Sequence, residues 1–342
     1  MSSPHPTDPP WGTRQVYDYP PPPVEVVPPP QPVLKTRLRT HVVLFVVTVI
    51  STILAGGGLY TLIGGVLLSF LAAPFAGLQQ FLLSLLTLFR VLLNPQLWLV
   101  NGLLFAGGLL SILLAHEFGH YFTAKRYGVP ATLPYFIPFP ISPFGTLGAV
   151  IRMSPRIPNR RALFDIAAAG PLAGLVLAIP FTYIGILFSR FIPKEAVGSG
   201  VITLSEPLLF QGLSWLAHGT VPETVDVILH PLAFAGWAGM FVTALNLLPI
   251  GQLDGGHVVH SLFGMRSRQV AFAMFGGLAI YSLVEWTGRW VVLLMLLLFI
   301  GIQHPRGQDD GRPLGRGRFY IGILLAIVFI TCFTLDPLQI RQ

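Results

Sequence analysis

Charged side chains are scarce in this sequence: Asp, Glu, Lys and Arg make up only 10% of its 342 residues. Soluble domains carry roughly 25% charged residues. Hydrophobic residues account for 53% of the chain, and its mean hydropathy is +0.70. Most of the chain therefore cannot lie in water. The composition predicts a multi-pass integral membrane protein with the lipid bilayer as its main surroundings.

Cysteine is almost absent, with Cys332 as the single example. One thiol excludes a disulfide framework and a cysteine-based metal site, so any metal must be bound by His, Asp or Glu. Residues 1–35 lack the apolar core of a cleavable signal peptide, and the first apolar run is expected to serve as an uncleaved targeting signal. The net charge of +7 is spread over short segments between apolar runs, so no nucleic-acid partner is expected.

The chain is expected to have four parts. Residues 1–35 contain 12 of the 31 prolines. Such a segment cannot form a hydrophobic core, and we expect a disordered cytoplasmic tail whose possible docking role is left open. The other parts are an N-terminal spanning helix with an interfacial segment over 36–95, a core over 96–265, and C-terminal spanning helices over 266–342.

Long apolar runs are the most abundant feature of the sequence. A spanning helix needs about 20 predominantly apolar residues. Seven runs come near this length: 41–64, 97–119, 163–189, 227–249, 269–286, 288–303 and 317–335. We therefore predict an all-α polytopic membrane protein with about seven transmembrane helices.

The apolar stretch 66–95 is predicted not to cross the membrane fully. Positive residues mark the cytoplasmic side, and they occur both at 35–39 and at Lys125 and Arg126. An even number of crossings must then separate these two positions, and the first two runs already supply them. The stretch 66–95 is therefore expected to be interfacial or re-entrant on the opposite side, with two short crossings as the alternative.

Residues 131–153 are apolar but unsuited to a helix. They contain four prolines, which forbid regular helical hydrogen bonding. Gly145, Gly148 and the β-prone residues 149–151 indicate a β-hairpin instead. Non-helical backbone at membrane depth survives only where protein or a water-filled cavity covers it. We expect a membrane-embedded hairpin beside a cavity, on the cytoplasmic side because four arginines follow within 152–161.

The second apolar run ends in the sequence His-Glu-Phe-Gly-His at 116–120. On a helix, His116 and His120 lie one turn apart on the same face, so both imidazoles can bind one metal ion. Glu117 is then placed to take a proton from water activated by the metal. Neutral imidazole suits zinc, and an unpaired glutamate at membrane depth would be costly unless it had a function.

Two histidines leave a zinc site incomplete, so a third ligand must come from another part of the chain. The candidates are Asp165, Asp254, His257, His260 and Glu285. Asp254 is favoured by its surroundings, because Pro249 and Gly251 interrupt an apolar run and free backbone groups there. Gly255 and Gly256 are expected to form a turn that aims the carboxylate.

These two segments resemble the site-2 protease family of intramembrane zinc metalloproteases. That family joins His-Glu-x-x-His on one helix to Asn-x-x-Pro-x-x-x-Leu-Asp-Gly on a later one, and both patterns occur here without departure at 116–120 and 246–255. The resemblance implies one zinc ion per chain with His116, His120 and Asp254 as ligands. It implies Glu117 as the general base, and Asn246 as a residue that steadies the substrate backbone or the oxyanion.

The resemblance extends over about 97–305. Gly-Pro-Leu-Ala-Gly at 170–174 is similar to an element of the family's middle core helix, where small residues permit close packing. This implies a three-helix catalytic core within 96–265. The family's hairpin is thought to bind substrate as an added strand, which implies that role for 145–151. The sequence is most similar to the subgroup shared by bacteria and plastids, and no PDZ or CBS module is evident.

The implied activity is zinc-dependent endoproteolysis within or near transmembrane segments of membrane-protein substrates. We expect the bacterial inner (plasma) membrane, with the active site near the cytoplasmic side. One alternative is a different His-Glu-x-x-His membrane protease whose third ligand is a glutamate, for which Glu285 is the late candidate. The other is a non-catalytic membrane scaffold or transporter. The substrate and the oligomeric state are left open.

Overall fold

The computed structural model describes residues 37–58, 66, 70, 78–196, 202–222, 224–285, 290–301 and 313–340. These residues all belong to one compact unit, Pro32–Gln342. The proline-rich tail predicted over 1–35 lies outside the described residues. So does much of the stretch 66–95 before residue 78.

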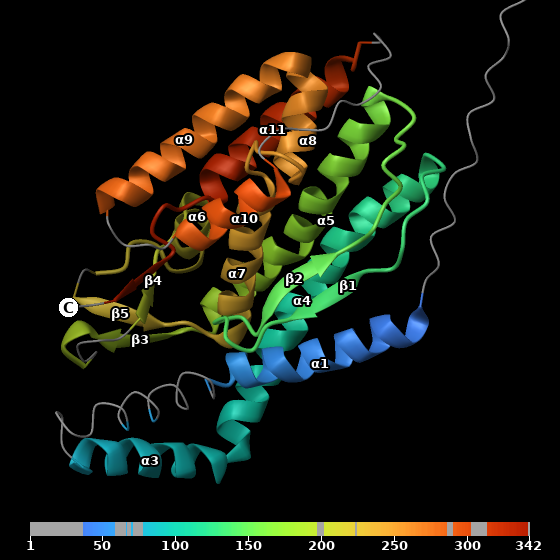
Figure 1. The fold of residues 1–342 in the computed structure, drawn as a ribbon. Helices are drawn as coiled ribbons and strands as arrows, with labels where there is room; N and C mark the ends of the chain where they lie inside the picture. The colour runs from blue at the N-terminus through green and yellow to red at the C-terminus, as the bar shows by residue number, and fades with distance from the viewer. Residues whose placement is uncertain are drawn as a thin grey trace, which may run out of the picture. The chain divides into compact units, whose positions relative to one another are not determined.

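The described part of the chain is predominantly helical (Figure 1). The helices are α1 (Leu38–Gly56), α3 (Leu78–Leu92), α4 (Pro95–Arg126), α5 (Arg160–Leu187), α6 (Leu208–His218), α7 (Pro231–Asn246), α8 (Asp254–Phe263), α9 (Ser267–Glu285), α10 (Val291–Ile300) and α11 (Arg316–Cys332). The strands are β1 (Tyr135–Pro138), β2 (Thr146–Val150), β3 (Arg190–Pro193), β4 (Ile202–Leu204), β5 (Val225–Ile228) and β6 (Leu338–Ile340).

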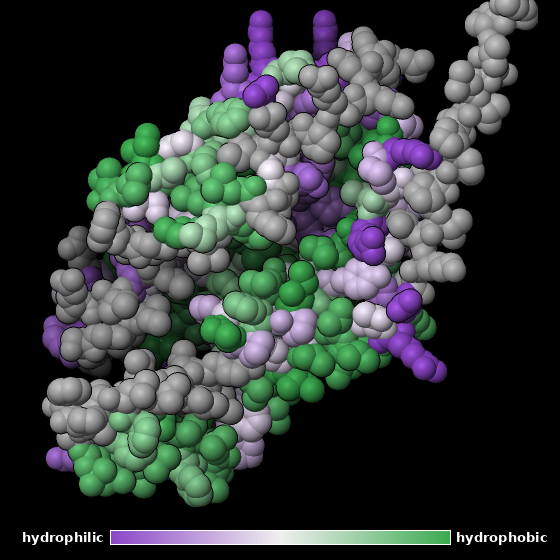
Figure 2. All heavy atoms as spheres, in the orientation of Figure 1, coloured by the Kyte–Doolittle hydropathy of each residue, from purple (hydrophilic) through white to green (hydrophobic). Residues whose placement is uncertain are grey.

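Each predicted apolar run contains a helix: α1, α4, α5, α7, α9, α10 and α11 in chain order. Among the described residues, four helical spans are long and apolar enough to cross a membrane. They are Leu38–Gly56, Trp98–Arg126, Arg160–Leu187 and Asp254–Glu285. Helices α7, α10 and α11 are shorter, so a count of seven crossings stays a prediction. Large hydrophobic side chains are exposed along many of these helices, and Figure 2 shows how widely hydrophobic residues cover the visible face.

Helices α4, α5 and α7 pack against one another and form the centre of the fold. Small residues line their contacts, because apolar helices in lipid associate by close van der Waals packing rather than by hiding from water. A Cβ atom on Gly185 of α5 would lie 2.1 Å from the backbone nitrogen of Ala233 on α7. One on Gly236 of α7 would lie 2.0 Å from the hydroxyl of Thr182. The helices therefore touch almost backbone to backbone.

The strands β1 and β2 pair antiparallel over the segment for which the sequence predicts a hairpin. The pairing joins Phe136 to Ala149 and Pro138 to Thr146, so two residues of β2 stand opposite one residue of β1. This is a β-bulge, and Gly148 within it has a φ of +106° that favours glycine. The hydroxyl of Thr146 accepts a hydrogen bond from the Gly148 N–H at 3.0 Å and stabilises the bulge.

Helix α1 binds both ends of this hairpin. The His41 ring stacks on Tyr135 with centroids 3.9 Å apart, and its Nδ1 lies 3.0 Å from the carbonyl oxygen of Pro134. At the turn, the hydroxyl of Ser51 donates to the carbonyl of Gly145 at 2.6 Å. His41 and Ser51 of α1 thus face the hairpin, while much of the rest of the helix is exposed and apolar.

Two further strand pairs were not predicted from the sequence. Strand β3 pairs antiparallel with β5, and β4 pairs antiparallel with β6 near the C-terminus. These strands are short, with three or four residues each, and they carry none of the turn signals that announce the first hairpin. The β4–β6 pair connects the C-terminal segment 338–340 to the segment between α5 and α6.

Replacing Gly185 by alanine is expected to destabilise the protein by about 1–3 kcal/mol, because the methyl group would collide with the backbone of α7. The matched control is Gly107→Ala on α4, where no heavy atom lies within 4 Å of the added Cβ. Thermal unfolding of both variants in detergent checks the expectation. Equal melting temperatures for the two variants would contradict the close packing of α5 against α7.

Candidate metal centre

Helix α4 carries two histidines whose imidazole rings lie close together. His116 and His120 are one turn apart, and their Nε2 atoms lie 3.1 Å from each other. Both residues are buried. The run predicted to end near the second histidine continues as helix to Arg126. His116 and His120 therefore lie inside the helix, roughly 15 Å and 9 Å before its end at 1.5 Å per residue, rather than at the end as predicted.

The neighbouring helix α5 orients His120. Its Nδ1 lies 2.8 Å from the carbonyl oxygen of Ile166. A carbonyl can only accept a hydrogen bond, so Nδ1 must carry the proton and donate it. The neutral ring then presents the lone pair of Nε2 toward the centre of the site, which is the arrangement found in metal-binding histidines.

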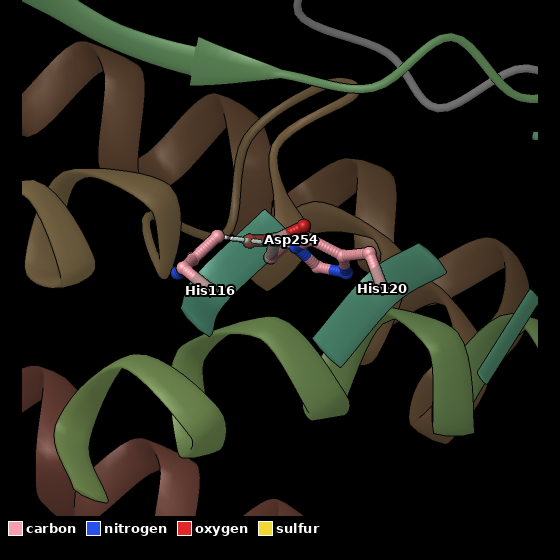
Figure 3. Close-up of side chains that lie close together, drawn as sticks. All are labelled: His116, His120 and Asp254. Carbon is pink, nitrogen blue, oxygen red and sulfur yellow. Dashed lines mark hydrogen bonds and ion pairs between the residues drawn. The ribbon is translucent and has the colours of Figure 1, made fainter. Parts of the chain in front are cut away.

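Asp254 reaches the same point from α8. Its Oδ2 lies 3.2 Å from Nε2 of His116 and 3.3 Å from Nε2 of His120, as Figure 3 shows. The backbone enters α8 from a non-helical segment over 247–253, in which Gly251 has a φ of +56°. Asp254 is the first residue of α8, so the loop delivers its carboxylate between the two imidazoles.

The predicted turn at Gly255 and Gly256 is wrong, because both residues lie inside α8. Their lack of a side chain has another role. A Cβ on Gly255 would lie 1.9 Å from the carbonyl oxygen of Leu247, and one on Gly256 would lie 2.4 Å from that of Gly251. These glycines let the loop fold back tightly onto the start of α8, which places Asp254.

The donor set fits a divalent metal ion. His116, His120 and Asp254 each offer one ligand atom, and these atoms all lie within 4.8 Å of one another. Two neutral nitrogens and one carboxylate oxygen are typical of a zinc site with a position left for water or substrate. Among the residues that the structure describes, this is the one such group of three.

Glycines on α4 and α5 make room for the imidazoles. A Cβ on Gly170 would lie 2.1 Å from Nε2 of His120, and one on Gly119 would lie 2.4 Å from the carbonyl oxygen of Ala169. At Gly174 a Cβ would lie 3.4 Å from the Cβ of His116. The glycines at 170 and 174, singled out in the sequence as a packing element, are therefore the surface of α5 against which both rings lie.

Glu117 is buried beside the metal ligands. It lines a cavity of about 230 Å³ together with His116, His120, Asn246 and Asp254. The opposite wall comes from the end of β2 and the residues after it, at 149–151 and 153. Ile151, directly after β2, lines this cavity together with Glu117. In Figure 2, hydrophilic residues lie in a recess between α8 and the hairpin.

Asn246 is the last residue of α7, directly before the loop that leads to Asp254. Its Nδ2 lies 3.3 Å from Nε2 of His116. The structure thus brings all five residues singled out from the sequence to one cavity. A residue that sequence reasoning missed is Ile166, whose contribution is a backbone carbonyl and so leaves no signal in residue type.

The other third-ligand candidates do not join the metal donors. Asp165 binds Arg318 and lies inside α5, whose N-cap is Asn159. His260 contacts the hydroxyl of Ser267 at 3.2 Å. His257 lines the cavity but lies outside the group of three. Glu285 is the last residue of α9 and lies outside the group of three.

A buried His-Glu-x-x-His helix that meets a carboxylate among apolar helices has the features of a membrane metallopeptidase. The family model for Peptidase family M50 matches residues 104–284, just over half of the chain. The chain therefore belongs to peptidase family M50. This confirms the resemblance to the site-2 proteases.

Curated relatives include plant plastid proteins. "Probable zinc metalloprotease EGY1, chloroplastic" of Oryza sativa subsp. japonica is 33% identical over 245 residues, covering 68% of this chain and 40% of the relative. "Probable zinc metallopeptidase EGY3, chloroplastic" of Arabidopsis thaliana is 31% identical over 261 residues, covering 69% of this chain and 43% of the relative. The chain thus spans less than half the length of these relatives. No solved structure matches the chain.

Replacing Gly170 by alanine is expected to lower zinc affinity on the order of 10- to 100-fold, because the new methyl group would displace Nε2 of His120. The matched control is Gly174→Ala, where the added Cβ makes only van der Waals contact. Competition with a chelator gives both affinities. Wild-type affinity in the Gly170 variant would show that α5 does not confine this ring.

Proposed function

We propose that the protein is a zinc-dependent intramembrane endopeptidase that hydrolyses peptide bonds within or near transmembrane segments. The observation that carries this proposal is the convergence of His116, His120 and Asp254 beside Glu117 in one cavity among apolar helices. Membership of peptidase family M50 supports it, and so do the printed names of the relatives.

Zinc is the metal proposed for this donor set. His116, His120 and Asp254 would hold it, and the carbonyl of Ile166 would keep Nε2 of His120 available. When bound, zinc supplies Lewis acidity, which polarises the scissile carbonyl and makes water a stronger acid. Two imidazoles and one carboxylate can also hold non-haem iron. Zinc is preferred here because the two histidines belong to a His-Glu-x-x-His helix, and because the printed names of the relatives are those of zinc metalloproteases.

Glu117 is the general base in this proposal. Its carboxylate takes a proton from the attacking water as the oxygen bonds to the carbonyl carbon. It then delivers that proton to the nitrogen of the departing amine as the peptide bond breaks. Burial beside the metal donors places it within the cavity where these transfers occur. The amide nitrogen of Asn246 lies 3.3 Å from Nε2 of His116. It can therefore donate a hydrogen bond to the backbone of a substrate bound beside the metal ligands, or to the developing oxyanion.

The free edge of β2 is the proposed substrate-binding element. Thr132 pairs with Arg152 on the side of β1, through Thr132 N–H to the Arg152 carbonyl at 2.9 Å. Neighbouring residues along a strand direct their backbone groups to opposite sides. The backbone groups of Ile151 therefore face away from β1, and this residue lines the same cavity as Glu117. A substrate added as a strand along this edge would pass directly over the base.

The proposed substrate is a membrane helix that can unwind locally, because a paired helical backbone hides its carbonyls from attack. Such a segment enters the cavity in extended form and gains strand hydrogen bonds in place of its helical ones. The third ligand Asp254 disfavours the alternative protease with a glutamate ligand. The scaffold alternative does not account for a buried Glu117 beside the metal donors.

We propose seven crossings, with the hairpin at membrane depth and α3 at the interface. The metal site would lie near the positively charged side, because α4 ends in Lys125 and Arg126. Sequence reasoning expected a bacterial plasma membrane. The relatives named above are chloroplastic, so they do not support that assignment, and the choice of membrane stays a prediction.

Replacing Glu117 by Gln is expected to abolish proteolysis while zinc is retained, because the amide cannot accept the proton but is not a ligand. Replacing Asp254 by Ala is the contrasting variant, and it is expected to lose both zinc and activity. Metal analysis of purified protein is compared with membrane-protein fragments in cells that express each form. Unchanged proteolysis in the Glu117 variant would contradict the mechanism.

A further inference from the structure

The C-terminal helix α11 contributes one arginine to the start of α5. Arg318 donates from Nε to Oδ1 of Asp165 and from Nη2 to Oδ2, and both distances are 2.7 Å. This is the bidentate geometry that a planar guanidinium forms with a carboxylate. The side chain of Arg318 is 28% exposed and that of Asp165 is 25% exposed. Solvent therefore screens the ion pair, which contributes little free energy of folding but holds the two side chains in a fixed geometry.

The same carboxylate also binds the end of α4. Tyr127, the first residue after that helix, donates from its hydroxyl to Oδ2 of Asp165 at 2.5 Å. Nη2 of Arg318 lies 3.4 Å from the same hydroxyl oxygen. Burial and the hydrogen bond to Asp165 raise the pKa of the Tyr127 phenol, so it stays protonated and donates. Three elements, the end of α4, α5 and α11, therefore meet on Asp165.

Asp165 directly precedes the residue that orients a metal ligand. The carbonyl of Ile166 accepts from Nδ1 of His120, and the Ile166 side chain is buried against Ala124 and Val129. The distance between α4 and α5 at this point decides whether the carbonyl reaches the imidazole. The hydrogen bond between Tyr127 and Asp165 connects these two helices one residue away from the Ile166 carbonyl.

We propose that Arg318 is a positioning residue for the metal centre, acting through Asp165 and Tyr127 on the carbonyl that orients His120. The inference rests on the proposed metal-dependent function. Arg318 lies outside the range 104–284 that the family model matches. Through Arg318, helix α11 would help to orient a metal ligand, although α11 supplies no residue to the cavity.

The test uses the purified 342-residue chain and six variants: Arg318→Gln, Arg318→Lys, Asp165→Asn, Tyr127→Phe, the control Arg316→Gln and the double variant Arg318→Gln/Asp165→Asn. Zinc affinity is measured by competition with a chelator, and cobalt(II) is substituted to record its visible absorption. We expect Arg318→Gln to weaken zinc binding on the order of fivefold, less than the 10- to 100-fold typical of direct partners of metal ligands. The cobalt bands are expected to shift, which a loss of overall stability alone would not cause.

Arg318→Lys keeps the charge but not the bidentate contact, so an intermediate affinity is expected. The matched control is Arg316→Gln on the same helix, whose side chain makes no hydrogen bond or ion pair within the described part of the chain. It should bind zinc as the wild type does. In the double variant with Asp165→Asn, the Arg318→Gln change should add little further loss, because the two residues act through one contact.

Several outcomes would overturn the proposal. Wild-type zinc affinity and cobalt bands in Arg318→Gln would show that the residue only stabilises α11, whatever the melting temperature. Additive losses in the double variant would do the same. If Arg318→Gln does not fold, Tyr127→Phe carries the test, since it removes a single hydroxyl. If the wild-type chain binds no zinc, the proposed function fails first, and this inference fails with it.

Discussion

The hydrogen bond from His120 to the carbonyl of Ile166 is the contact on which the metal centre depends. It crosses from α4 to α5, and it fixes both the ring orientation and the nitrogen that remains free for a metal. The helices can approach this closely only because Gly119 and Gly170 leave room at the crossing. In a membrane, where water does not drive helices together, such small residues determine which surfaces can meet.

The second requirement is an interruption of helical structure between α7 and α8. A continuous helix would carry Asp254 past the imidazoles, whereas the loop over 247–253 turns the chain back and starts α8 with that carboxylate. The freed backbone groups are tolerated because the loop is buried in protein, with Leu248 and Ile250 fully enclosed. Helix α1 contacts the hairpin at Pro134 and Gly145, whereas Leu147 and Val150 of β2 are exposed.

Residue type and spacing predicted His116, Glu117 and His120 and favoured Asp254, because metal and proton chemistry permit few side chains, whereas Asn246 came from the family resemblance. The structure brings these five residues to one cavity, and their roles stay predictions. Hydropathy located the helices because a helix that crosses lipid needs a long apolar run. The turn at Gly255 and Gly256 was predicted wrongly because glycine permits both a turn and a close helix contact, and only the surroundings decide between them. The strands β3 to β6 and the partner of Asp165 depend on contacts distant in sequence, which local patterns do not encode.

The coordination of zinc in the purified protein tests the central claim most directly. X-ray absorption fine structure of the zinc-loaded chain reports the number and type of ligand atoms. The account predicts two imidazole nitrogens and oxygen donors, with one oxygen lost in Asp254→Ala. A site with a third imidazole, or one that Asp254→Ala leaves unaltered, would contradict the convergence of His116, His120 and Asp254 on one metal ion.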